Sequence, residues 1–137
     1  MKIKLVGSCA RGVASPHDVD LLLEEVPDSW LKFFADRAQD DEDPDHDRIY
    51  LGDLYEQALA EVGPEFAAWT DEVVKAHYDC GRPLDIFFGC NPGGWNLAIW
   101  LEAPSWSITE RVFGEDFYLE GHEVTWAEVG ALKESTL

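Results

Sequence analysis

The chain has 137 residues, the length of one ordinary domain, and 46% hydrophobic with 12% aromatic residues is the composition of a folded protein. Its charge is unusual, because 28 acidic residues against 10 basic residues leave a formal net charge of -18. Such a charge repels a polyphosphate backbone, which argues against a protein that grips long nucleic acid by itself. Three explanations for the acidity stay open: adaptation to high salt, attraction of a basic partner, or a solvated surface unrelated to any site.

The cysteines and the N-terminus bear on location. Cys9, Cys80 and Cys90 form neither a C-x-x-C pair nor a metal-ligand spacing, and an odd count argues against a disulfide framework. The N-terminus lacks the apolar run of a signal peptide. No stretch approaches the roughly 20 apolar residues that a membrane helix needs. We therefore expect a soluble, cytoplasmic protein.

The first predicted elements, in chain order, are two short apolar strands over residues 3–6 and 19–23. Between them, residues 8–12 are small and polar enough to start a short helix. A helix is predicted from Asp28 or Ser29 to about Gln39, where the acidic run 40–47 ends it. That run lacks the glycine and the glutamate of an EF-hand loop, so we interpret it as a solvated loop.

Two further helices are predicted over residues 51–62 and 64–78, joined at Gly63 and Pro64. Residues 84–88 form a third predicted strand, residues 95–101 are apolar but ambiguous, and residues 117–119 with 123–126 suggest a hairpin. The expected fold is α/β (α+β), a small mixed sheet with packed helices. It forms a single domain over residues 1–137 with a helical insertion over about 28–80.

A glycine-serine turn and a pair of aspartates lie on either side of the short predicted helix. Gly7 lets the backbone approach a phosphate closely, and Ser8 with the amides of the following helix can donate hydrogen bonds to phosphate oxygens. Arg11 adds a cation. Asp18 and Asp20 are separated by one residue, so on an extended strand both carboxylates project from the same face.

A third aspartate, Asp85, interrupts the apolar run 84–88. Buried strands do not carry a charged residue without a partner. If this strand lies next to the strand that carries Asp18 and Asp20, the three carboxylates converge on one site. Mg²⁺ prefers such hard oxygen ligands together with substrate phosphates, so the pattern indicates phosphoryl or nucleotidyl transfer.

In these elements the sequence resembles the DNA polymerase beta nucleotidyltransferase superfamily, whose pattern is a G-S turn, a short helix, a D-x-D strand and a later strand with a third Asp. Residues 95–100 are similar to a nucleotide-contacting segment of family X polymerases and small phage-type nucleotidyltransferases. Residues 117–132 are similar to the hairpin and closing helix of such palm domains. One departure is that residues 102–105 read Glu-Ala-Pro-Ser where family X members usually have a Gly-Ser pair.

The resemblance implies a metal-dependent nucleotidyltransferase that moves a nucleoside monophosphate from an NTP or dNTP to a hydroxyl and releases pyrophosphate. Its catalytic and metal-binding residues would be Asp18, Asp20 and Asp85, with two Mg²⁺ or Mn²⁺ ions. The acceptor stays open among a nucleic-acid 3′ end, another protein and a small molecule. The residues expected to contact the nucleotide are Gly7, Ser8, Arg11, Trp95 and Trp100.

The alternative function is that of a binding partner. Small nucleotidyltransferase domains also resemble antitoxins that pair with helical toxins, so the chain is also compatible with a non-catalytic or weakly catalytic antitoxin-like protein. In that case its acidic surface would contact a basic partner protein.

Overall fold

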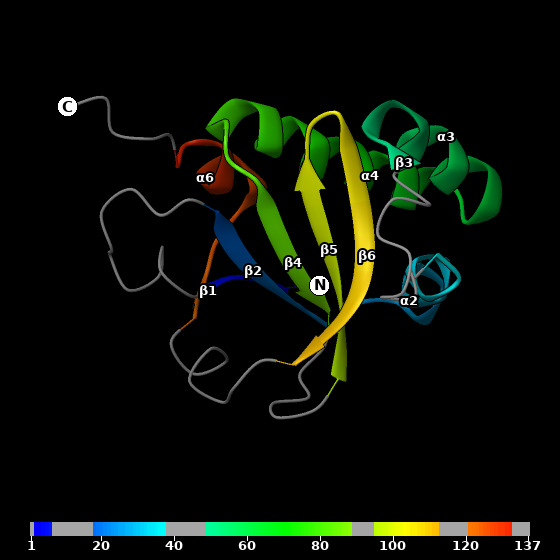
Figure 1. Ribbon diagram of the computed structural model, residues 1–137, viewed down its shortest axis with the longest axis horizontal. Helices are drawn as coiled ribbons and strands as arrows, with labels where there is room; N and C mark the ends of the chain where they lie inside the picture. Colours follow the sequence, from blue (N-terminus) through cyan, green and yellow to red (C-terminus); the bar gives the residue numbers. More distant parts are fainter. Residues whose placement is uncertain (1, 7–17, 38–48, 89–94, 113–120, 133–137) are drawn as a thin grey trace.

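The computed structural model describes residues 2–6, 18–37, 49–88, 95–112 and 121–132 (Figure 1). Within these residues a seven-stranded sheet has the strand order β3-β6-β5-β4-β2-β1-β7. Among its described strands, β2 and β4 are the one parallel pair, and the other neighbours are antiparallel. The small mixed sheet with packed helices that the sequence predicts is therefore confirmed. The short helix expected over residues 8–12 and the acidic loop over 40–47 lie outside the described residues.

The two N-terminal strands lie side by side in the sheet. β1 (Lys2–Val6) and β2 (Val19–Glu24) are each one residue longer than predicted and pair in antiparallel register. On the far side of β1, the short strand β7 (His122–Glu123) pairs with Lys4 and Leu5. The apolar runs that predict these strands thus occupy one half of the sheet.

The predicted insertion is mostly helical. It contains α2 (Asp28–Ala35), α3 (Leu51–Glu61) and α4 (Pro64–Cys80). Helix α2 ends before the predicted end near Gln39, and α4 continues two residues past its predicted end, to Cys80. Gly81 caps α4, and its φ of 70° is the left-handed conformation that glycine adopts at a helix end. The insertion is not purely helical, because β3 (Ile49–Tyr50) pairs with β6 at the edge of the sheet.

The second half of the sheet contains one expected strand, one ambiguous segment and one missed strand. β4 (Leu84–Phe88) has its predicted bounds, and the ambiguous apolar segment is the strand β5 (Trp95–Glu102). β6 (Ser105–Val112) was not predicted, although Trp106 and Ile108 are buried and alternate with polar residues. That alternation is the two-residue period of a strand with one face in the core.

The predicted strand over residues 123–126 is wrong in its second half, where Thr125 begins helix α6 (Trp126–Gly130). The Thr125 hydroxyl accepts a hydrogen bond from the Glu128 backbone N–H at 3.2 Å, and the Glu128 carboxylate accepts one from the Thr125 N–H at 3.1 Å. This capping box satisfies two backbone donors at the start of the helix, which outweighs the β propensity of the segment. Residues 117–119, the other half of the predicted hairpin, lie outside the described residues.

The helices pack on one face of the sheet. Alternate side chains of β2, namely Val19, Leu21 and Leu23, belong to the main core together with side chains from the helices. Aromatic rings dominate this core, and the Phe34 ring lies 5.0 Å from Phe88 between centroids. The opposite face carries a smaller buried cluster: Val6, Leu22, Phe87 and Ala98. Among the described residues, no helix is long and apolar enough to cross a membrane.

A buried histidine joins the end of α4 to two other parts of the chain. The backbone N–H of Ala103, in the turn between β5 and β6, donates to His77 Nε2 at 2.9 Å. Nδ1 lies 2.7 Å from the Arg82 carbonyl oxygen. Because a backbone N–H only donates and a carbonyl only accepts, Nε2 is the acceptor and Nδ1 the donor in these two hydrogen bonds. His77 thereby holds α4, the start of β4 and the β5–β6 turn together.

Replacing His77 tests this junction. We expect His77→Ala to lower the free energy of unfolding by about 2–4 kcal/mol, because it leaves the Arg82 carbonyl, buried beside the ring, without its partner and opens a cavity where the buried imidazole stood. Urea unfolding followed by circular dichroism measures the change. His122→Ala, the same substitution at an exposed position of β7, is the matched control and should change stability by about 0.5 kcal/mol or less. Equal effects of the two substitutions would contradict the assignment.

Cys80, at the last position of α4, is buried, and burial raises the pKa of its thiol. In a Cys9→Ser, Cys90→Ser background we expect Cys80 to react with iodoacetamide much more slowly in the folded protein than in urea, because little thiolate is present and access is blocked. The raised pKa means that the folded state holds the Cys80 thiol proton more tightly than the unfolded state. The stability that this protonated thiol contributes is therefore complete below the ordinary thiol pKa, and it is lost as the pH rises through the raised pKa of the folded state. Equal alkylation rates with and without urea would refute the expectation.

Candidate metal centre

The register between β2 and β4 decides which side chains meet at the candidate site. The backbone N–H of Val19 donates to the carbonyl of Pro83 at 2.9 Å, immediately before β4. From that hydrogen bond the parallel ladder pairs Val19 with Leu84 and Asp20 with Asp85. Paired residues of neighbouring strands project from the same face. Val19 and Leu84 therefore enter the main core, whereas Asp20 and Asp85 lie together on the opposite face.

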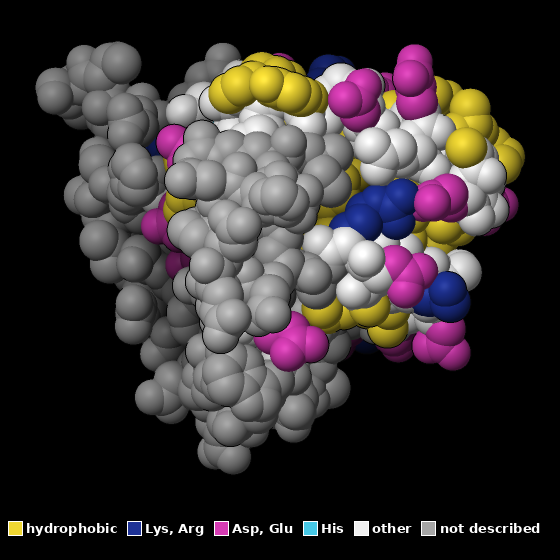
Figure 2. Space-filling model, turned by 45° about the vertical axis from the view of Figure 1, so that its right-hand side comes forward, with side chains coloured by type: hydrophobic (Ala, Val, Ile, Leu, Met, Phe, Trp, Pro, Cys, Tyr) yellow, Lys and Arg dark blue, Asp and Glu magenta, His cyan; other side chains and the backbone are white. Residues whose placement is uncertain are grey.

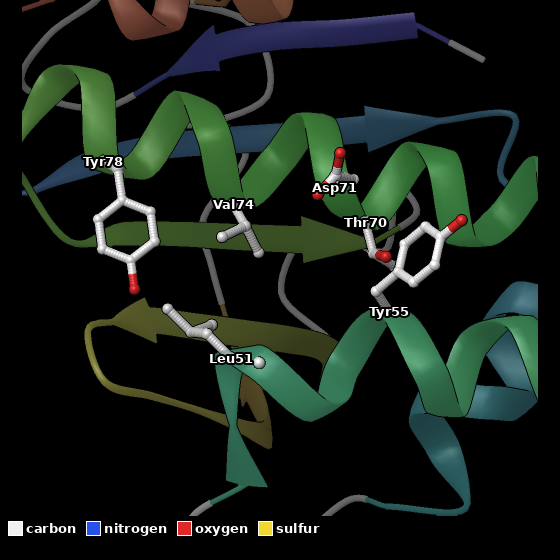
Figure 3. A pocket seen from close by; sticks show the side chains of 7 residues that line it. Leu51, Tyr55, Thr70, Asp71, Val74 and Tyr78 are labelled. Atoms are coloured by element: carbon white, nitrogen blue, oxygen red, sulfur yellow. The ribbon is translucent and has the colours of Figure 1, made fainter.

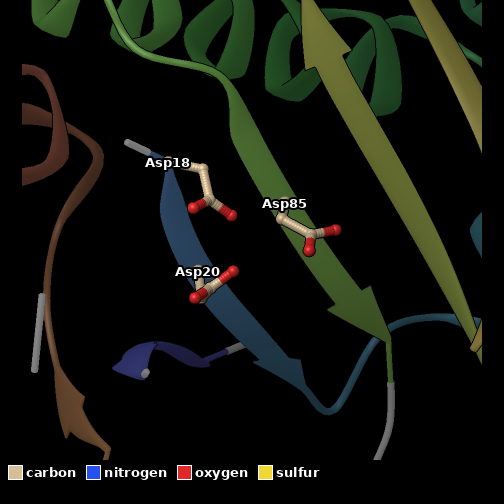
Figure 4. A group of neighbouring side chains, drawn as sticks. All are labelled: Asp18, Asp20 and Asp85. Atoms are coloured by element: carbon tan, nitrogen blue, oxygen red, sulfur yellow. The ribbon is translucent and has the colours of Figure 1, made fainter. Parts of the chain in front are cut away.

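The three predicted aspartates come together at this point. Asp18 stands one residue before β2, and its carboxylate points toward those of Asp20 and Asp85 (Figure 4). One oxygen of each carboxylate can be chosen so that all three atoms lie within 4.8 Å of one another. Asp18 and Asp20 are half-buried, and Asp85 is only 2% exposed. The expected meeting of the three carboxylates, which requires β2 and β4 to be neighbours, is thus present.

The electrostatics of such a cluster favour a cation. Two unit charges at this separation repel by roughly 3 kcal/mol at an effective dielectric constant of about 20, and by less where solvent reaches the half-buried pair. A divalent ion between the carboxylates replaces this repulsion with attraction. Carboxylate oxygens are lone-pair acceptors, the kind of atom that binds a metal ion.

The donor set tests which metal the residues fit. All three donors are carboxylates, and hard oxygen donors of this kind suit Mg²⁺ and Mn²⁺. A structural zinc site would instead draw on cysteine and histidine. Mg²⁺ typically keeps waters or substrate phosphates beside one or two carboxylates. The residues present therefore fit the expected Mg²⁺ or Mn²⁺ ions with substrate oxygens completing the coordination.

Trp100 is the predicted nucleotide-contacting residue that the structure places beside this cluster. It pairs with Asp85 across the β4–β5 ladder, so its side chain leaves the sheet on the carboxylate face. The indole ring is half-buried, and its N–H donates to the Glu102 carboxylate at 2.9 Å. A flat, anchored ring therefore stands next to the most buried of the three carboxylates.

The other predicted nucleotide contacts remain sequence-based. Gly7, Ser8 and Arg11 lie outside the described residues. Trp95 is the first residue of β5, where it pairs with Val112, and its side chain is outside the described set. The structure therefore places Trp100, and none of the other four, relative to the carboxylates.

Two polar residues on the carboxylate face were missed from the sequence. Ser107 pairs with Trp100 and so extends the row that runs from Asp20 through Asp85. Asn96 is buried on β5, but it lies four positions before Trp100 along the strand, about 13 Å away at 3.3 Å per residue. Asn96 was detectable by the signal that reveals Asp85, a polar residue in an apolar run. Ser107 could not be assigned to this face from the sequence, because β6 was not predicted.

Comparisons with models of protein families, with curated proteins and with solved structures gave no match for this chain. The likeness to DNA polymerase beta-type nucleotidyltransferases therefore stays a resemblance of motifs.

A metal titration tests the centre without reference to any reaction. We expect Mn²⁺ or Mg²⁺ to raise the melting temperature of the wild-type protein, because an ion that binds the folded state stabilises it by about 1.4 kcal/mol at ten times its Kd. For a chain of this size that corresponds to a few degrees. Asp85→Asn should lose most of this shift, whereas Asp53→Asn, which removes an exposed charge on α3, should retain it. Equal shifts in both variants would show that the ions bind elsewhere.

Proposed function

We propose that this protein is a metal-dependent nucleotidyltransferase, which moves a nucleoside monophosphate from an NTP or dNTP to a hydroxyl acceptor and releases pyrophosphate. The observation that carries the proposal is the convergence of three carboxylates from two adjacent parallel strands, with their oxygens within 4.8 Å and one of them in a buried strand. A solvated acidic surface does not require any carboxylate to be buried. The resemblance of motifs adds the type of transfer.

The three carboxylates would have different roles in metal binding, according to their positions. Asp18 and Asp20 project from the start of β2 and would hold both metal ions between them, and Asp85 would complete the coordination on the acceptor side. Divalent metal bound there would neutralise charge on the phosphates and lower the pKa of the acceptor hydroxyl. Because Asp85 is held in the middle of the sheet, its carboxylate does not have to be reoriented for each turnover.

The transfer itself is a single displacement. The acceptor oxygen forms a bond to the α-phosphorus, the bond from that phosphorus to the β-phosphate bridging oxygen breaks, and the hydroxyl proton is released to solvent. The triphosphate would be held by Gly7, Ser8 and the amides after them, with Arg11 adding positive charge. This part of the proposal rests on the sequence pattern.

Trp100 is the candidate platform for the nucleobase. Bases stack on aromatic side chains with about 1–3 kcal/mol each, with little dependence on sequence. The hydrogen bond from the indole N–H to Glu102 restrains the ring beside Asp85. A nucleotide whose base stacked there could place its phosphates near the neighbouring carboxylates. Trp95 is the second candidate, proposed from the sequence.

The acceptor class follows in part from charge. A net charge of -18 opposes unaided binding of a long polyanion, so a nucleic-acid 3′ end would have to be presented by a partner protein. A hydroxyl on another protein or on a small molecule requires no such help. Both of these acceptors therefore agree better with the composition.

The decisive measurement is transfer of label from α-labelled NTPs and dNTPs to candidate acceptors, in Mg²⁺ and in Mn²⁺. Wild type should label an acceptor and release pyrophosphate, and Asp85→Asn should lose about two orders of magnitude or more in rate, the scale of removing one preorganised electrostatic group. Asp53→Asn is the charge-matched control on α3 and should retain activity. Circular dichroism of each variant checks that the fold is kept.

The alternative, an antitoxin-like binding partner, predicts a different result. Asp85→Asn would then leave biological function unchanged, because contacts with a basic partner would depend on the surface and not on the carboxylate cluster. Equal, metal-independent signals from wild type and Asp85→Asn would sink the catalytic assignment.

A further inference from the structure

A groove lies between α3 and α4, away from the carboxylate cluster. It has a volume of about 190 Å³, and Tyr55 and Tyr78 stand at its two ends with Leu51 and Val74 between them (Figure 3). Helices α3 and α4 contribute to the core on the opposite sheet face from the three aspartates. The metal centre therefore does not account for the groove.

The groove exposes aromatic surface that the fold does not use. Tyr55 is 43% exposed and Tyr78 is 59% exposed, among the few large hydrophobic residues that remain at the described surface. The floor between them is apolar, because Leu51 is buried and Val74 is half-buried. Asp71 lines the same groove from α4, near Tyr55, so the site combines aromatic faces with a carboxylate (Figure 3).

The surroundings of the groove are strongly acidic. Figure 2 brings the α2 and α3 side forward and shows Asp and Glu side chains there, together with hydrophobic side chains and some Lys and Arg. Lys75 is the one Lys or Arg in the two helices. Their seven acidic residues are Asp53, Glu56, Glu61, Glu65, Asp71, Glu72 and Asp79.

Charge selects the occupant of this groove. A second copy of the chain would bring another net charge of -18 against the same acidic helices, and a nucleic acid would bring its phosphates, so both are repelled. A segment of a basic protein is attracted. We propose that the α3–α4 groove binds a lysine or arginine side chain from such a segment.

The chemistry of the groove matches a cationic side chain along its whole length. The charged head would lie between the Asp71 carboxylate and the Tyr55 ring, combining an ion pair with a cation–π contact. The methylene stem would lie on Leu51 and Val74, since long basic side chains cover apolar surface with their stems. Tyr78 would cover the other end of the segment.

The protein already uses this combination within itself. The Arg37 guanidinium stands over the Phe33 ring, 3.8 Å from its centroid, and also forms an ion pair with Glu61 at the end of α3. An aromatic face on α2 and a carboxylate on α3 thus hold one arginine of the same chain. The groove offers the same pair of groups to a cation from outside.

The test is an NMR titration of the ¹⁵N-labelled protein with a short amidated alanine-based peptide that carries arginines one helical turn apart. A second peptide replaces each arginine with citrulline, which has nearly the same shape without the charge. The variants are Asp71→Asn, Tyr55→Leu and Tyr55→Phe. Glu72→Gln removes an equal charge from the same helix outside the groove and is the matched control. The amide spectrum of each variant reports whether it folds.

We expect arginine-peptide shifts to be confined to α3 and α4. Asp71→Asn and Tyr55→Leu should each weaken binding about two- to five-fold, whereas Tyr55→Phe keeps the ring face and should bind like wild type. Glu72→Gln should have a smaller effect than Asp71→Asn, and the citrulline peptide should not bind.

Three results would overturn the proposal. If Glu72→Gln weakens binding of the arginine peptide as much as Asp71→Asn does, the peptide is attracted by the overall negative charge and not by the groove. If the citrulline peptide binds as well as the arginine peptide, the contact is apolar and does not need a cation. Self-association in sedimentation that is lost on changing Tyr55 would assign the groove to a second copy. None of these outcomes depends on the nucleotidyltransferase activity.

Discussion

The parallel pairing of β2 with β4 is the constraint on which the candidate site depends. A single backbone hydrogen bond, from Val19 to Pro83, begins a ladder that places Asp20 beside Asp85. Because side chains alternate along a strand, a slip of one residue would put Asp85 into the aromatic core and a leucine among the carboxylates. The apolar residues on either side of Asp85 prevent that slip, since they belong to buried clusters on the helical face. The core therefore specifies the position of the charges.

The sheet separates stability from chemistry by its two faces. Helices and aromatic rings cover one face and supply most of the buried apolar surface, whereas the other face carries the carboxylates, Trp100 and a small apolar cluster. His77 links a helix of the covered face to the sheet, because its ring joins the end of α4 to the turn that follows β5 and to the segment that leads into β4. His77 thus anchors the strand that carries Asp85 near its start and the strand that carries Trp100 near its end.

The acidity of the chain has two physical meanings in this structure. Three aspartates are concentrated at one point, where their mutual repulsion favours a divalent ion. The acids of α3 and α4 are instead spread over solvent-exposed surface beside exposed tyrosines, where they would attract the basic segment that we propose for the groove. A net charge of -18 does not distinguish these roles, because it sums over both.

Local patterns in the sequence are enough to predict the strands that carry Asp20 and Asp85 and the three helices of the insertion, because hydrophobic periodicity acts over a few neighbouring residues. The side-chain cap expected from Asp28 or Ser29 is not present, since Pro27 stands at the N-cap of α2. The same local patterns missed β6, whose pairing partners lie in β5 and in the distant β3, and they misassigned Thr125, where a local capping box outweighed β propensity. The tertiary fold alone brings Asp85 beside Asp20 and Trp100 beside Asp85, and it places two tyrosines at the ends of an acidic groove. These are contacts between elements that are far apart in the chain, and their register comes from packing of the whole core, which no local pattern encodes.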